Sequence, residues 1–218
     1  MSDEGIIFDL DGTLWDSSEG VVKSWNEVIE TYKEINYMMT VEAMKGFMGK
    51  TLDEISKLFF ADVSDEKRKE IMAKCSLHEL EYLAQTGGVL FPELAETLIN
   101  LSSNYKLFIV SNCQAGYIET FLEYHKFKGY FADYENPGRT GKLKGENIKI
   151  IMGRNNLKSS VYIGDTQGDY NAAKIAGIPF IHAKYGFGEI HEPVHYVNSF
   201  SDIPDKVKEL MHLGTKTI

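Results

Sequence analysis

The chain has 218 residues, of which 43% are apolar and 25% charged, with a net charge of −9 and an isoelectric point near 5.2. This composition is typical of a folded globular protein, and its acidic balance argues against a broad surface for nucleic acid or anionic membrane. No run of about 18 apolar residues predicts a membrane span, and no secretion signal is recognisable. Cys75 and Cys113 lack the spacing of zinc ligands, so we expect packed thiols and a cytoplasmic location.

The first predicted element is a buried strand at Gly5–Phe8, followed at once by the motif Asp9-Leu10-Asp11-Gly12-Thr13-Leu14. Both carboxylates reach the crevice beyond a parallel sheet only if the chain leaves the strand there, and Gly12 permits that turn. An Asp-Gly pair alone is more often a simple turn. Asp9 and Asp11 are therefore candidates for chemistry only together with further polar residues at strand ends.

The next part of the chain, about residues 16–86, is far longer than one crossover between parallel strands and has the apolar periodicity of helices. Two capping boxes predict helix starts, and a charge-rich third helix is predicted to end at a Gly-Gly pair. These signals lie at Asp16 and Glu19, at Thr51 and Glu54, and at Asp65–Gln85 with Gly87 and Gly88. We predict a helical cap domain at 16–86, inserted into a core formed by 1–15 and 87–218.

Strands and helices alternate through the rest of the chain. A helix opened by Pro92 leads into the second strand of the core. Further strands are predicted at Leu107–Val110, Val161–Ile163 and Pro179–Ala183, and helices at Gln114–Phe127, Glu146–Asn155 and Asp169–Ala176. This alternation predicts an α/β fold, a doubly wound, Rossmann-like parallel sheet with an inserted α-helical cap domain.

Polar residues again follow the second predicted strand. Ser111 and Asn112 precede a helix, where they either bind phosphate together with backbone N–H groups or only cap the helix. A short basic stretch with Lys142 and Lys144 precedes the next helix. A lysine here either neutralises a phosphate or is a solvated surface charge.

The third predicted strand is followed by Gly164-Asp165-Thr166-Gln167-Gly168-Asp169. Mg²⁺ is typically bound by one or two carboxylates together with substrate phosphate and water, and Asp165 is the better placed ligand. Asp169 is either a second ligand or a carboxylate that stabilises the N-terminus of the helix. One further motif, His191-Glu192-Pro193-Val194-His195, matches the zinc-protease pattern HExxH, but Pro193 predicts a loop instead of the helix that this pattern needs.

Successive strand ends thus carry Asp-x-Asp-Gly-Thr, Ser, Lys and Gly-Asp-x-x-x-Asp in this order. The combination resembles the haloacid dehalogenase superfamily, in the phosphoglycolate phosphatase-like and β-phosphoglucomutase-like branch with a helical cap, and covers essentially the whole chain. The resemblance implies a nucleophile, an acid/base, phosphate-binding groups and metal ligands. By this resemblance Asp9 is the nucleophile and Asp11 the acid/base. The phosphate-binding groups are Ser111, Asn112 and Lys144. The metal ligands are Asp9, the backbone carbonyl of Asp11, Asp165 and Asp169. Lys144 is preferred because it begins Lys-Gly-Glu-Asn-Ile and adjoins the helix, and Lys142, which fits a Lys-Pro-x-Pro alignment whose prolines are missing here, stays open as the alternative.

By this resemblance we expect a Mg²⁺-dependent phosphatase that hydrolyses a small phosphorylated metabolite through an aspartyl-phosphate. Phosphoglycolate, a sugar phosphate and a nucleotide are all open as substrates. A phosphomutase of the same superfamily and a catalytically silent regulatory or binding protein are the alternatives, whereas a dehalogenase needs neither Asp11 nor a metal. We expect a monomer or weak homodimer with no nucleic-acid or membrane partner. Candidates to face the leaving group are Trp15, Lys23, Phe47, Lys50 and the loop around Arg139.

Overall fold

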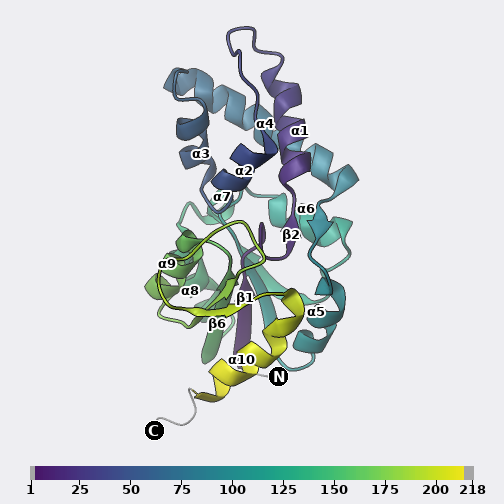
Figure 1. Ribbon diagram of the computed structural model, residues 1–218, viewed down its shortest axis with the longest axis vertical. Coiled ribbons are helices and arrows are strands. Elements are labelled where there is room, and N and C mark those ends of the chain that lie inside the picture. The colour runs from purple at the N-terminus through teal and green to yellow at the C-terminus, as the bar shows by residue number, and fades with distance from the viewer. Residues whose placement is uncertain (1–2, 214–218) are drawn as a thin grey trace.

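The computed structural model describes residues 3–213 and contains a six-stranded sheet with a group of helices beyond one edge (Figure 1). The strand order is β5-β4-β1-β6-β7-β8, and every neighbouring pair is parallel. The strands are β1 (Glu4–Phe8), β4 (Lys106–Val110), β5 (Phe131–Glu135), β6 (Ser159–Gly164), β7 (Phe180–Ala183) and β8 (His195–Val197). This confirms the predicted doubly wound α/β fold and the four predicted strands, which are β1, β4, β6 and β7.

Helices cover both faces of the sheet because successive side chains of each strand point to opposite faces. Ile7, Phe108 and Tyr162 face α8 and α9, whereas Ile6 and Ile163 belong to the core on the other face, under α5 and α10. These helices are α5 (Leu94–Ser102), α8 (Lys144–Arg154), α9 (Gln167–Ala176) and α10 (Ile203–Leu213). Because helices cover both faces, the carboxyl ends of the strands are the part of the sheet where a ligand site can form.

The helices α1–α4, with the segments between them, follow β1 in the chain and lie beyond the carboxyl edge of the sheet (Figure 1). We call this group the helical cap. Its helices are α1 (Ser18–Ile29), α2 (Val41–Phe47), α3 (Leu52–Phe59) and α4 (Asp65–Thr86). The chain enters and leaves the cap through two short antiparallel strands, β2 (Trp15–Asp16) and β3 (Val89–Leu90), which pair with each other. The domain boundaries near residues 15 and 87 stay a prediction.

Two capping boxes were predicted for the cap, and one of them is wrong. The box of Thr51 and Glu54 is present at α3, but Asp16 does not cap α1. Instead Asp16 lies in β2, where it accepts hydrogen bonds from the backbone N–H and the hydroxyl of Ser18 and forms an ion pair with Lys45 at 2.9 Å. The hydroxyl of Ser18 and the pairing of β2 with β3 engage Asp16 in place of the capping geometry, so helix α1 begins later than the sequence predicts.

Several helix starts in the core also differ from prediction. Helix α5 begins at Leu94 and not at Pro92, because Glu93 before it has a left-handed conformation, with φ of 61°. The predicted helix at Gln114–Phe127 is shorter, since Gly116 with φ of 93° interrupts the chain just before α6. Helix α8 includes Lys144, two residues earlier than predicted. The remaining helical segments are α6 (Tyr117–Tyr124), α7 (Pro137–Thr140) and the 3₁₀ turn η1 (Phe200–Asp202).

No helix in the described part of the chain, 3–213, is long and apolar enough to cross a membrane.

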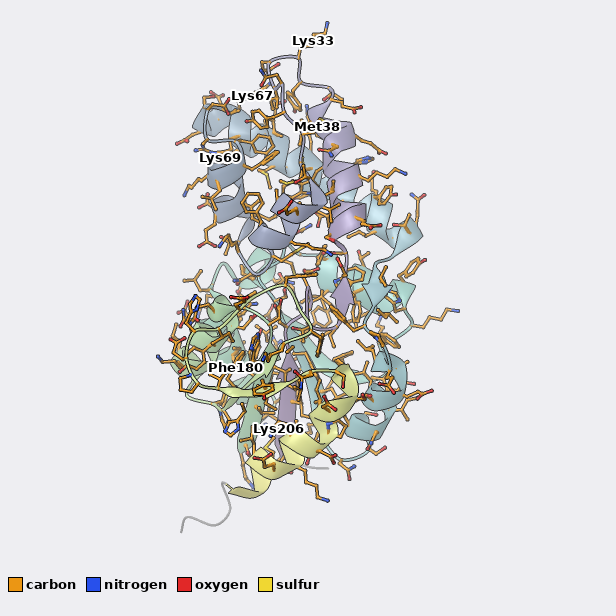
Figure 2. All side chains as sticks on the ribbon, in the orientation of Figure 1. Lys33, Met38, Lys67, Lys69, Phe180 and Lys206 are labelled. Carbon is orange, nitrogen blue, oxygen red and sulfur yellow. The ribbon has the colours of Figure 1, made fainter. Side chains whose placement is uncertain are left out.

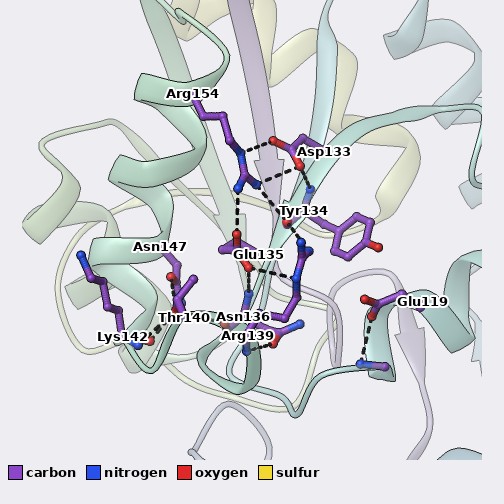
Figure 3. Close-up of polar contacts among 11 residues, drawn as sticks. Glu119, Asp133, Tyr134, Glu135, Asn136, Arg139, Thr140, Lys142, Asn147 and Arg154 are labelled. Carbon is purple, nitrogen blue, oxygen red and sulfur yellow. Dashed lines mark hydrogen bonds and ion pairs between the residues drawn. The ribbon is translucent and has the colours of Figure 1, made fainter.

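The edge strand β5 carries a polar network instead of a continuous apolar run, and Figure 3 shows its contacts. Arg154 donates to Asp133 at 2.8 Å and to Glu135 at 3.0 Å, and Arg139 lies 3.5 Å from the same Glu135. Glu135 is only 3% exposed, so its carboxylate depends on these partners for compensation. The network therefore holds the edge strand to α8.

We expect Arg154→Ala to lower the free energy of unfolding by about 1–3 kcal/mol, because the buried carboxylate of Glu135 then loses its best partner. Urea denaturation measures the change. The matched control is Lys158→Ala, which removes an exposed ion pair to Asp3 of 2.7 Å and should cost less than about 0.5 kcal/mol. Equal losses in the two variants would contradict a structural role for the network.

Candidate active site

Three aspartates meet at the carboxyl edge of the sheet. Asp9 follows β1, and Asp165 and Asp169 follow β6, the strand that pairs with β1. One carboxylate oxygen from each lies within 4.8 Å of the other two, and all three side chains are at most 1% exposed. We call these residues the acidic cluster. Motifs far apart in the chain are therefore brought to one place by the parallel pairing of two strands.

The turn after β1 must approach Asp165 closely, and this explains Gly12. Its φ is 78°, a backbone conformation that residues other than glycine rarely adopt. A Cβ atom at this position would also clash with the carboxylate of Asp165. Gly186 is similar, since a Cβ atom would meet Asp165 and the backbone of Gly12. The next residue, Phe187, donates its backbone N–H to Asp165 Oδ2 at 2.7 Å. Sequence reasoning missed this loop, whose signal was the Gly-x-Gly spacing after β7.

Lys144 supplies positive charge inside the cluster. It is 3% exposed, and its Nζ lies 2.6 Å from Asp169 Oδ1 and 3.0 Å from Asp9 Oδ1. Burial lowers the pKa of Lys144, but the charges of Asp169 and Asp9 outweigh this and raise it above the usual value. Lys142, the alternative lysine, is exposed. Of the two, only Lys144 contacts the aspartates.

Asp169 has the helix-stabilising role, one of the two that the sequence left open, and its second carboxylate oxygen lies in the acidic cluster. Its Oδ2 accepts hydrogen bonds from the backbone N–H and hydroxyl of Thr166, which completes a capping box at the start of α9. Its Oδ1 binds Lys144 and belongs to the acidic cluster. Asp169 thus stabilises the helix and orients the lysine, while its role as a direct metal ligand stays a prediction.

The cluster has the chemistry of a site for a hard divalent cation. Burial, followed by the charge of Asp169, raises the pKa of Asp9 to about 7, and burial with the charges of Asp169 and Asp9 raises that of Asp165. Among the described residues, Asp165 Oδ1 is shielded from solvent and has no hydrogen-bond partner. Oxygen atoms in this state are suitable ligands for Mg²⁺. Asp9, Asp165 and Asp169 are therefore the residues that could hold a metal.

Asp11 is two residues from Asp9, but its carboxylate is not part of the acidic cluster. It is 8% exposed, and its Oδ1 accepts hydrogen bonds from Trp15 Nε1 at 2.9 Å, Ser17 Oγ at 2.7 Å and Tyr117 OH at 2.9 Å. Burial raises the pKa of Asp11, although these three donors partly oppose the shift. The two carboxylates thus have separate surroundings, which allows them separate functions.

A pocket lies between the helical cap and the sheet, and we call it the cap–core pocket. The core contributes Asp11, Ser111, Asn112, Cys113, Gln114 and Tyr117, and the cap contributes residues that include Trp25, Phe47, Lys50 and Glu79. Asn112 also joins the two layers, since its Nδ2 donates to the backbone oxygen of Gly49 at 2.9 Å. A second hollow shares Met48, Gly49, Lys50 and Asn112 with this pocket.

The five residues expected to face a leaving group divide into three sets. Phe47 and Lys50 line the cap–core pocket. Trp15 is fully buried and contacts Asp11. Lys23 lies over the ring of Tyr82 and Arg139 over that of Tyr134, so both are engaged elsewhere.

Three lysines of the cap and the histidines of the HExxH motif are not among the residues that line the site. Lys33, Lys67 and Lys69 project from the part of the cap remote from the sheet (Figure 2). His191 lies in a loop and His195 begins β8, so the segment is not the helix that a zinc-protease motif requires, as predicted.

Comparison with known proteins agrees with this geometry. The phosphoglycolate phosphatases of Vibrio parahaemolyticus and Salmonella typhimurium are 24% and 27% identical to the chain, over 95% and 91% of it and 94% and 90% of their own lengths. The crystal structure of a predicted phosphatase from Clostridium acetobutylicum has a TM-score of 0.78 at 25% identity, covering 96% of this chain and 100% of that one. The model of the haloacid dehalogenase-like hydrolase family matches residues 6–183, and the chain therefore belongs to that family.

Proposed function

We propose that the chain is a Mg²⁺-dependent phosphatase that hydrolyses a small phosphorylated metabolite through an aspartyl-phosphate on Asp9. The observation that carries the proposal is the convergence of Asp9, Asp165 and Asp169 around the buried Lys144. Folding alone does not require several carboxylates to be buried together, and it is costly to bury them. The similarity to phosphoglycolate phosphatases over most of the chain supports the same reaction class.

In the proposed reaction, a carboxylate oxygen of Asp9 attacks phosphorus while Asp11 gives a proton to the departing alcohol. Asp11 then takes a proton from the water that cleaves the aspartyl-phosphate, and this regenerates both residues. Lys144 and Ser111, which is buried at the end of β4, would bind the phosphoryl oxygens. A bound Mg²⁺, held by Asp9, Asp165, Asp169 and the backbone carbonyl of Asp11, would neutralise negative charge on the phosphate.

The surroundings of Asp11 support its role as acid and base. The hydrogen bonds from Trp15, Ser17 and Tyr117 fix its orientation, and its burial favours the protonated form needed for the first step. Ser17 and Trp15 lie where the chain enters the helical cap. We infer that residues 16–86 act as a cap domain whose position is coupled to Asp11.

The first test is Asp9→Asn, which keeps the size of the side chain but removes the attacking carboxylate. We expect hydrolysis of p-nitrophenyl phosphate to fall roughly 10³-fold or more. The control is Asp53→Asn, on an exposed ion pair of α3, which should hydrolyse the ester as fast as the wild type. Activity retained by Asp9→Asn would exclude the covalent mechanism, and wild type without any turnover would favour a silent binding protein. A phosphomutase would instead move the phosphate within a sugar phosphate without releasing it.

Removal of divalent cations with EDTA should abolish hydrolysis, and Mg²⁺ should restore it, because the acidic cluster otherwise repels a dianionic phosphate. Mg²⁺ should also raise the melting temperature by roughly 5–10 °C at a concentration of about 100 Kd. The Asp165→Asn variant should lose this thermal response. A response that persists in this variant would place the cation elsewhere.

The two lysine candidates are separated by a pair of variants. Lys144→Met should lower kcat/KM roughly 10²–10³-fold, because the buried charge next to Asp9 is lost. Lys142→Met, on the exposed segment before α8, should stay within about twofold of the wild type. Steady-state kinetics with p-nitrophenyl phosphate measure both, and the reverse order of the effects would exchange the roles of the two residues.

A further inference from the structure

Glu79 is a buried carboxylate of the helical cap that the proposed reaction does not use. It belongs to α4, is 3% exposed, and lines the cap–core pocket together with Asp11. Its Oε2 accepts a hydrogen bond from Trp25 Nε1 at 2.5 Å, and its Oε1 accepts one from Gln114 Nε2 at 3.0 Å. Both donors also line the pocket, so the carboxylate is held in a fixed orientation at its wall.

The packing of α4 calls for a hydrogen-bond acceptor at this position, to pair with Trp25 and Gln114, but not for a charged one. The other buried residues of this helix that share its stripe are Met72, Cys75 and Leu83, at the helical spacing of residue 79. An apolar side chain at position 79 would continue the stripe but would leave the buried N–H of Trp25 without its acceptor, whereas a neutral amide there would accept that hydrogen bond without the cost of burying a charge. Each oxygen of an ionised carboxylate accepts about two hydrogen bonds, so Glu79 can accept more than the two from Trp25 and Gln114.

We propose that Glu79 binds the leaving alcohol and selects phosphate esters whose alcohol carries hydroxyl donors over those whose alcohol carries a carboxylate. This inference rests on the proposed phosphatase function, and it names the substrate class of that site. The pocket joins Glu79 to Asp11, the residue proposed to protonate the departing oxygen, and to Ser111, proposed to bind the phosphate. An alcohol leaving toward Asp11 is therefore directed to Glu79.

The pocket offers acceptors to such an alcohol. An ionised carboxylate only accepts hydrogen bonds, so it pairs with a hydroxyl group and repels a second carboxylate. Among the described residues, Asn112 Oδ1 is also shielded from solvent and has no hydrogen-bond partner, which adds a neutral acceptor on the core side. Lys50 lines the pocket as well, but it is exposed, and solvent screens its charge more than that of Glu79.

A preference for esters of hydroxylated alcohols would distinguish the substrate of this chain from that of the relatives it resembles. Phosphoglycolate, after which those relatives are named, releases glycolate, whose carboxylate would enter the pocket beside Glu79. Burial raises the pKa of Glu79 to about 7, although Trp25 and Gln114 oppose the shift. At pH 8 the side chain is therefore mainly ionised, and the discrimination is best measured there.

The experiment compares kcat/KM for glycerol 1-phosphate and for phosphoglycolate at pH 8 with Mg²⁺. We expect the wild type to favour glycerol 1-phosphate at least about tenfold, and Glu79→Gln to lower the ratio of the two constants at least about tenfold. A ratio measured in one preparation does not depend on how much of the variant is folded. Glu81→Gln, an exposed acid of the same helix that is 64% accessible, is the matched control and should keep the wild-type ratio.

The outcomes separate this inference from the proposed function. A wild type that favours phosphoglycolate, or a ratio that Glu79→Gln leaves unchanged, overturns the inference. The phosphatase proposal survives either result if p-nitrophenyl phosphate is still hydrolysed and Asp9→Asn abolishes this hydrolysis. Absence of Asp9-dependent hydrolysis of all three esters contradicts the phosphatase proposal, and the inference falls with it.

Discussion

The burial of several negative charges within a few ångströms of one another is the constraint on which the rest of the structure depends. Asp9, Asp165 and Asp169 are almost completely shielded, and Lys144 is the positive group that lies among them. Carboxylates in this state are stable only if protons, hydrogen bonds or cations compensate them. The capping box at α9, the backbone N–H of Phe187 and the close turn at Gly12 each contribute to that compensation or make room for it.

The topology of the sheet determines which residues can meet under this constraint. Strand β1 lies between β4 and β6, so Asp9 is flanked by the residues that follow both neighbours. Asp165 comes from one side and Ser111 from the other, although they are far from Asp9 in sequence. Helix α8 packs beside α9 and brings Lys144 to the same edge. A change of strand order would separate these groups even if each element formed correctly.

Elements with strong local signals could be predicted, whereas contacts between distant elements could not. The apolar runs of β1, β4, β6 and β7 mark buried strands, but β5, with the sequence FADYE, depends on the ion pairs of Asp133 and Glu135 with Arg154. The three donors to Asp11 could not be read from spacing, because Tyr117 is 106 positions away from it. Glu79 likewise reads as one more charge of a charge-rich helix until the fold places it against Gln114.

The two ends of the proposed substrate need surroundings of opposite charge, and the site has positive charge at one end and hydrogen-bond acceptors at the other. The phosphate needs positive charge, which Lys144 and a bound cation would supply at the sheet edge. The alcohol would meet Glu79 from the cap and Asn112 from the core in the cap–core pocket, where a second anionic group is disfavoured. A phosphate bound next to Glu79 would be repelled, so this polarity would also fix the direction in which an ester enters. Asp11 lines the pocket that contains Glu79 and is two residues from Asp9, so in the proposed reaction it would lie near the bond to the leaving oxygen.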